Sequence, residues 1–188
     1  PPERRSWAMG VVSAAGSFGQ FLMVPTESML ISQWGWQQAL VVLAVGILII
    51  LPLSLGLREP GFAAGQAPVR SQSILQALRE AFGYRSFQLL MAGYFVCGFQ
   101  VVFIGVHLPS FLKDQGMSPQ LASTALALIG LFNIVGTYAA GSLGQVMAKN
   151  KILSGIYLAR GVIIAIFISL PITPLSVYIF AAAMGLLW

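Results

Sequence analysis

The sequence is divided into successive apolar runs, each about as long as a helix that crosses a lipid bilayer. Five runs are complete and a sixth is short; they cover residues 7–31, 36–57, 87–112, 121–151, 152–172 and 175–188. A spanning helix needs about 20 consecutive, mostly apolar residues. Charged residues make up 8% of the chain and hydrophobic residues 57%, whereas soluble domains contain roughly 25% and 45–50%. The sequence therefore predicts an all-α, polytopic membrane protein.

The basic residues lie in the connections between these runs, and they predict how the chain is oriented. If the runs cross the membrane alternately, only Lys113 falls on one side. Eight basic residues fall on the other side: Arg4, Arg5, Arg58, Arg70, Arg79, Arg85, Lys149 and Lys151. Short basic connections stay in the cytoplasm. We therefore expect residues 58–86 and 144–151 to be cytoplasmic, with the protein in a bacterial inner (plasma) membrane. This distribution also argues against a nucleic-acid partner, despite a net charge of +5.

The sequence contains none of the residue patterns that carry enzymatic chemistry. It has no paired carboxylates, no nucleophile with its base, no HExxH and no phosphate-binding loop. Cys97 is the single cysteine, so it forms no intramolecular disulfide and offers no CxxC metal spacing. We expect no enzymatic activity, no cofactor and no metal. Any transport would draw on a gradient of an ion or a solute.

Residues 58–86 differ in composition from the apolar runs and form the longest gap between them. The stretch EPGFAAGQAP has the Gly, Pro and Ala content of a flexible linker. In the following SILQALREAF, Ser73 and Gln76 have the spacing of a capping box. Ile74, Leu75 and Phe82 fall on one face with Leu78, which predicts a short helix on the membrane surface. The chain is thus divided into residues 1–57, 58–86 and 87–188.

Small and polar residues interrupt one face of the run 121–151. Gly130, Asn133, Thr137, Gly141 and Gly144 are spaced by three or four, so they share one stripe of a helix. An amide inside a membrane is costly and usually faces protein or water. Small residues allow another helix to approach closely.

The run 7–31 has a similar stripe, formed by Gly10, Ser13, Ser17, Gln20 and Glu27. Gly16 and Gly19 lie beside this stripe, and we expect them to permit close packing against another helix. Pro25 is expected to kink the helix.

Several of these stretches resemble the major facilitator superfamily of transporters. A tryptophan-marked aliphatic run, a long cytoplasmic linker and a Gly-rich basic loop follow one another in the order typical of that family. In the loop motif G-x-L-x-D-R-x-G-R-K, Gly141, Leu143 and the basic Lys149 match, whereas Gln145, Val146 and Ala148 do not. The stretches RRSWAMGVVSAAGSFGQF, GWQQAL, HLPSFLKDQG and LFNIVGTYAAG are similar to the monocarboxylate and oxalate–formate type of carrier.

The resemblance implies that the chain is a fragment carrying helices five to ten of twelve. Residues 1–57 would be the last two helices of the N-terminal bundle, and residues 87–188 the first four of the C-terminal bundle, the last one truncated. Helices five and eight pack together in that fold, and solute binds between the bundles near the midplane. The implied partners are a small solute, the lipid bilayer and the remaining helices of a monomeric full-length protein. The implied function is secondary transport of a (mono)carboxylate by alternating access, with proton coupling or exchange.

The candidate substrate-binding residues are Asn133, Gln100 and Thr137. For Asn133 and Gln100, the alternative is a hydrogen bond between helices, worth about 0.6 kcal/mol on average in membranes. The Thr137 hydroxyl can instead bond the backbone of its own helix. In carboxylate carriers of the resembled type, a cation often stands four residues after an acidic or amide residue on helix eight. Asn133 fits the first position and Thr137 occupies the second.

His107 and Glu27 are candidates for proton coupling, because histidine titrates near neutral pH and both fall toward the outer ends of their runs. Arg160 lies in the middle of the run 152–172. It can serve as the cation for an anionic solute, or it can pair with a neighbouring carbonyl or acid. Two other functions remain open at this point: an efflux carrier for apolar or cationic compounds, and a membrane scaffold or sensor that transports nothing.

Overall fold

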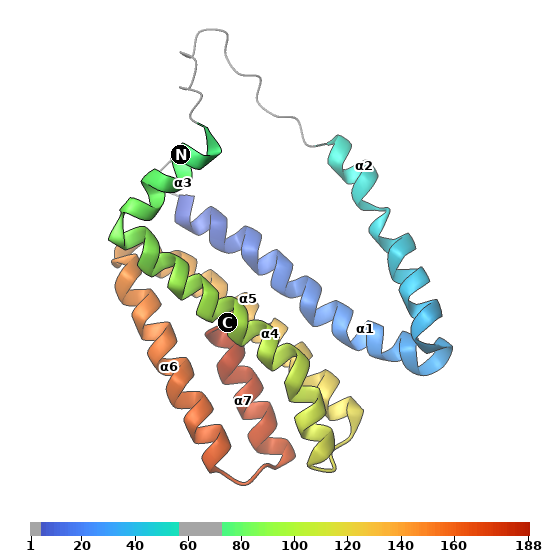
Figure 1. Cartoon of the computed structure of the whole chain (residues 1–188). Helices are drawn as coiled ribbons and strands as arrows, with labels where there is room; N and C mark the ends of the chain where they lie inside the picture. The colour runs from blue at the N-terminus through green and yellow to red at the C-terminus, as the bar shows by residue number, and fades with distance from the viewer. Residues whose placement is uncertain (1–4, 57–72) are drawn as a thin grey trace. The chain divides into compact units, whose positions relative to one another are not determined.

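A computed structural model describes residues 5–56 and 73–188. The elements in these ranges are α1 (Arg5–Ile47), α2 (Ile50–Leu55), α3 (Ile74–Gly83), α4 (Arg85–Asp114), α5 (Pro119–Val146), α6 (Lys149–Ser169) and α7 (Pro174–Leu186) (Figure 1). Neither described range contains a strand, so the all-α prediction is confirmed. The predicted linker EPGFAAGQAP lies outside the described residues.

Four helical stretches of the described chain are long and apolar enough to cross a membrane. They are Ser6–Leu55, Arg85–Asp114, Pro119–Val146 and Lys149–Ser169, and Pro174–Leu186 is a shorter apolar helix. The first has 50 residues and would be about 75 Å long as one straight helix, well over the ~30 Å hydrocarbon core of a bilayer. These lengths and compositions make the chain a multi-pass integral membrane protein.

The first long stretch is interrupted at Gly35, which divides α1 into two helices. Gly35 has φ 78° and ψ 165°, a backbone conformation open to glycine because it lacks a Cβ atom. Trp34 and Trp36 flank the break, and the break separates the predicted runs 7–31 and 36–57. Pro25 lies inside the helical part of α1 before this break.

Side-chain caps explain where several helices begin. The Ser73 Oγ accepts a hydrogen bond from the Gln76 backbone N–H at 3.2 Å, at the start of α3. Ser118 caps α5 in the same way, with Pro119 in the first turn. At α7, Thr173 and Ser176 form a reciprocal capping box. Each cap satisfies a backbone donor that the first helical turn leaves without a partner.

The chain forms two compact units, and each is described by itself. The first comprises Pro1–Ala39 and Ile104–Trp188, and the second comprises Leu40–Phe103. The core of the first unit joins the end of α4 to α5, α6 and α7; its buried members are Ile104, Leu108, Leu112, Ala122, Ala125, Ile129, Phe167, Val177, Phe180, Ala181 and Met184. In the second unit, most apolar side chains of α2, α3 and α4 are exposed, as suits surfaces that meet lipid or further helices.

Helices α5 and α7 pack at backbone distance in the first unit, where glycines remove the intervening side chains. A Cβ atom added at Gly136 would overlap the Leu186 carbonyl group. A Cβ atom at Gly185 would lie 2.6 Å from the Ile129 carbonyl oxygen and 2.8 Å from the Phe132 Cβ. Such close backbone approach is a common way to stabilise helix pairs in membranes.

Candidate functional site

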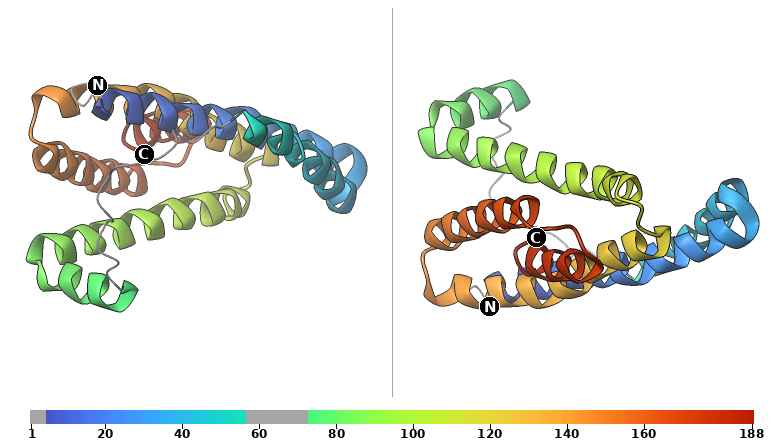
Figure 2. Two further views of the ribbon diagram at one scale, coloured as in Figure 1. Left: turned by 90° about the horizontal axis from the view of Figure 1, so that it is seen from above. Right: turned by 90° about the horizontal axis from the view of Figure 1, so that it is seen from below.

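The first part of α1 lies against α5, and the two helices run antiparallel (Figure 2). A Cβ atom at Gly141 would lie 3.0 Å from the Gly10 Cα. Further along, a Cβ atom at Gly130 would lie 2.7 Å from the Phe21 backbone nitrogen. At the other end, the Ser6 Oγ would lie 2.8 Å from a Cβ atom at Gly144. We call this contact the α1–α5 seam; it uses three glycines of the stripe found in the sequence.

On α1, the seam is formed by Gly10 and Ser17 of the predicted stripe, together with Ala14. Gly10 is buried, and Ala14 and Ser17 are 9% and 6% exposed. A Cβ atom at Gly16 or Gly19 would meet nothing within 4 Å. At about 100° per residue, these two glycines point roughly 120° and 180° away from Gly10. The close packing on α1 within the described helices therefore belongs to Gly10, Ala14 and Ser17, and the packing role expected for Gly16 and Gly19 stays a prediction.

Two of the predicted substrate-binding residues, Asn133 and Thr137, contact each other on α5. The Thr137 hydroxyl donates a hydrogen bond of 2.8 Å to the Asn133 Oδ1. Both side chains are half-buried. The expected alternative for Thr137, a bond to the backbone of its own helix, is not the arrangement seen. One turn of helix separates the two residues, which is the spacing at which side chains on one face meet.

The nitrogen of the Asn133 carboxamide remains accessible. Within residues 5–56 and 73–188, no fully buried side-chain nitrogen or oxygen lacks a hydrogen-bond partner. The only hydrogen bond recorded for Asn133 in those ranges joins its oxygen to Thr137. Asn133 lies in the stripe between Gly130 and Thr137. The amide therefore offers N–H donors at a half-buried position in a membrane-length helix.

The other candidate residues lie on α4 and α1. Gln100 is half-buried on α4, in the second unit. His107 is exposed on the part of α4 that belongs to the first unit. Glu27 is half-buried on α1. The structure thus brings Asn133 and Thr137 together.

Arg160 on α6 is 4% exposed and pairs with a neighbouring helix. Its Nε donates a hydrogen bond of 2.5 Å to the carbonyl oxygen of Leu187, the residue that follows α7. Its guanidinium carbon lies 5.7 Å from the centre of the Tyr157 ring, within the range of a cation–π contact. Of the two roles left open by the sequence, this arrangement matches pairing with a carbonyl group.

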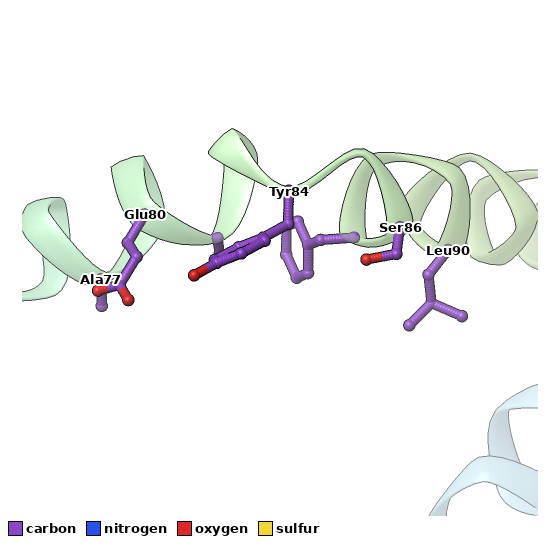
Figure 3. A pocket seen from close by; sticks show the side chains of 7 residues that line it. Ala77, Glu80, Tyr84, Ser86 and Leu90 are labelled. Carbon is purple, nitrogen blue, oxygen red and sulfur yellow. The ribbon is translucent and has the colours of Figure 1, made fainter.

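A groove of about 570 Å³ lies in the second unit, where α3 meets α4 (Figure 3). The Gln88 Nε2 donates to the Phe82 carbonyl oxygen at 2.7 Å, and the Phe82 and Phe87 rings meet edge to face at 5.3 Å. These two contacts fix the bend between the helices. Glu80 and Tyr84 line the groove with Ala77, Ala81, Ser86, Phe87 and Leu90. None of the predicted site residues lines it.

Sequence reasoning missed the contact between Gly136 and α7. Gly136 is adjacent to Thr137 but lies about 100° further round the helix, outside the stripe that the sequence pattern marked. Gly185 falls in the short sixth run, where Ser176 stands at the start and no row of polar residues marks one face. The sequence signal for this contact was that the glycines of α5 fall on two different faces of the helix.

The described helices and the buried helix seam define a class: an all-α, multi-pass membrane protein in which α5 is packed on two sides. Comparison with known proteins narrows this class. The family model of the Major Facilitator Superfamily matches residues 1–188. The chain therefore belongs to the major facilitator superfamily, a family of membrane transporters.

The chain is also similar to a curated bacterial protein. It is 26% identical over 154 residues to the uncharacterized MFS-type transporter YcxA of Bacillus subtilis (strain 168), an alignment covering 79% of this chain and 36% of that protein. The chain thus spans about a third of the length of this relative. No solved structure matches the chain. Both positive comparisons are with membrane transporters.

Proposed function

We propose that the protein is a secondary transporter that moves a small organic solute, a (mono)carboxylate, by alternating access. Membership of the superfamily supports the transport role. The observation that carries the choice of solute is the half-buried Asn133 amide, whose nitrogen is accessible while its oxygen is bonded to Thr137. N–H donors in a weakly solvated site stabilise the oxygens of a carboxylate.

The proposal assigns the chain to helices five to ten of a twelve-helix protein of the monocarboxylate and oxalate–formate type. Residues 1–57 then close the N-terminal bundle, and residues 87–188 open the C-terminal bundle. Asn133 and Gln100 contact the solute near the midplane. His107 and Glu27 are the candidates for proton coupling, and exchange of solutes is the alternative means of driving transport.

The α1–α5 seam supports a mechanical part of this proposal. Helix pairs that touch through glycine backbones can shift without forcing side chains past one another. Gly130, Gly141 and Gly144 place α5 against α1 in this way. We assign to the seam the closing of one end of the solute pathway.

Uptake of radiolabelled pyruvate into proteoliposomes of the full-length protein tests the proposal. We expect uptake driven by a proton gradient or by internal pyruvate, and a loss of at least tenfold in uptake for Asn133→Ala and for Gln100→Ala. Gly161→Ala is the control, since a Cβ atom there meets nothing within 4 Å. Unchanged uptake in both test variants would remove these residues from the site, and uptake of cations in place of pyruvate would favour an efflux carrier.

A further inference from the structure

Helix α3 carries an apolar face that the described chain leaves exposed. Its residues Ile74, Leu75, Leu78 and Phe82 are 82%, 78%, 46% and 50% exposed, and no residue of α3 is buried. At about 100° per residue, these four side chains lie within one arc of roughly 100° around the helix. A short helix with one apolar face and one polar face needs an apolar surface to cover it.

The position of α3 in the chain places it at the edge of the membrane. Tyr84 alone separates the end of α3 at Gly83 from the start of α4 at Arg85, and α4 is a membrane-length helix. One residue spans at most about 3.6 Å, so α3 ends beside the first turn of a helix that crosses the bilayer. Tyrosine is itself enriched where membrane and water meet. The surface closest to α3 is therefore that of the lipid bilayer.

The bend between the helices turns the apolar side of α3 along α4. Ala77 and Ala81 border the apolar face, and they line the groove at the bend together with Phe87 and Leu90 of α4 (Figure 3). Glu80 also lines this groove, roughly 60° further from the apolar face than Ala77. Lipid surrounds the exposed side of a spanning helix. The side of α3 that faces along α4 is thus the side that meets the bilayer.

Arginines flank this apolar face. Arg79 lies roughly 40° round the helix from Leu75, and Arg85 opens α4; both are exposed. The whole connection 58–86 contains four arginines and two glutamates, so its charge is complementary to an anionic surface. An arginine beside an apolar face can keep its alkyl stem among apolar groups while its guanidinium group reaches a phosphate.

We propose that α3 docks its apolar face into the surface of the lipid bilayer, where Arg79 and Arg85 bind the headgroups of anionic phospholipids. Docked in this way, α3 anchors the start of α4 at the membrane surface. The choice of lipid over a protein partner follows from the single residue between α3 and α4 and from the flanking arginines. This docking is independent of the solute that the protein transports.

The depth of a fluorophore tests whether lipid covers the apolar face. In a Cys97→Ser background of the full-length protein, Leu78→Cys and Gln76→Cys are each labelled with bimane and placed in liposomes whose lipids carry brominated chains. We expect strong quenching at position 78 and weak quenching at position 76, because Gln76 points roughly 160° away from Leu78. A bimane at position 78 that the brominated chains leave unquenched would show that protein covers the face, and it would overturn the proposal.

The choice of headgroup is tested with brominated phosphatidylglycerol and brominated phosphatidylcholine, each at the same mole fraction in phosphatidylcholine liposomes. We expect an apparent association constant about two- to fivefold higher for phosphatidylglycerol, from quenching at position 78. Arg79→Gln with Arg85→Gln should bring the ratio of the two constants close to one. Salt at ~1 M should do the same, because the Debye length is then about 3 Å.

Lys113→Gln is the matched control for the arginine variants, because it removes a basic residue at the other end of α4. It should leave the ratio of the two constants unchanged. Equal constants for the two lipids with both arginines present would overturn the proposal, as would a ratio that persists without them. The measurement requires no transported solute, so its outcome is separate from that of the pyruvate uptake experiment.

Discussion

Single glycines set how closely the helices of the first unit pack. At Gly136, Gly141 and Gly185 the atom nearest to an added Cβ belongs to the backbone of a neighbouring helix. A flexible side chain can turn away from a new methyl group, but a backbone can move only with its whole helix. These positions therefore tolerate added volume less well than glycines on open surfaces.

Gly136→Ala should lower the stability of the full-length protein, because the new Cβ overlaps the Leu186 carbonyl. Overpacking of this kind costs roughly 1–3 kcal/mol. The measurement is the midpoint of thermal unfolding in nanodiscs. Gly155→Ala on α6 is the matched control, since nothing lies within 4 Å of its added Cβ, and alanine favours helix over glycine. A midpoint for Gly136→Ala at or above that of Gly155→Ala would contradict the packing described.

Replacing Arg160 distinguishes a structural role from a role in binding solute. Arg160→Met removes the hydrogen bond from the Arg160 guanidinium to the Leu187 carbonyl oxygen, and a hydrogen bond to a charged group contributes roughly 1.5–3 kcal/mol. We expect a lower unfolding midpoint and an unchanged KM for pyruvate. Arg160→Lys, which keeps the charge but not the Nε donor, should be intermediate in stability. A large rise in KM with Arg160→Met that Arg160→Lys reverses would instead make Arg160 the cation for the solute.

At the scale of elements, the α1–α5 seam can be tested by a cross-link. The Ser6 Cβ lies 3.9 Å from a Cβ atom built at Gly144, within the roughly 3.5–4.5 Å range of disulfides. In a Cys97→Ser background, Ser6→Cys with Gly144→Cys should form a disulfide under mild oxidation. A protease site inserted within residues 58–72 would make the disulfide detectable. After cleavage at this site, the two fragments should stay joined on a non-reducing gel if the disulfide has formed.

The same pair of cysteines tests whether the seam moves during transport. Oxidation should reduce pyruvate uptake, and a reducing agent should restore it. Gly16→Cys with Gly144→Cys is the control, because Gly16 has no neighbour within 4 Å of its Cβ position, and this pair should stay unlinked. A linked protein that transports at the full rate would show that the seam is static.

At the scale of the whole molecule, the distribution of basic residues predicts which connections face the cytoplasm. In a Cys97→Ser background, Asn150→Cys and Gln76→Cys should react with a membrane-impermeant thiol reagent only after cells are opened. Gln115→Cys lies near Lys113, the single basic residue predicted outside the cytoplasm, and should react in intact cells. Labelling of Asn150→Cys in intact cells would reverse the predicted orientation.

Much of this architecture could be predicted from sequence because membrane helices carry their signal locally. The length of the apolar runs predicted the membrane-spanning helices, and Ser73 before an apolar face predicted the start of α3. The close contacts were harder, because a glycine does not indicate which neighbour it faces. Gly16 and Gly136 show this in opposite ways: the first was expected to pack and has open space, and the second packs most tightly. The bond between Thr137 and Asn133 depends on side-chain rotamers, which spacing does not fix.

The packing of α5 against the backbones of α1 and α7 also limits which mutations of the gene the protein tolerates. Every single-base missense change in a glycine codon adds at least a β-carbon. At Gly10, Gly136 and Gly141 that carbon would meet a neighbouring backbone or force it to shift, whereas at Gly155 and Gly161 it would meet open space. In a saturation-mutagenesis library selected for growth on the transported solute, surviving clones should therefore keep glycine at positions 10, 136 and 141. Substitutions should accumulate at positions 155 and 161.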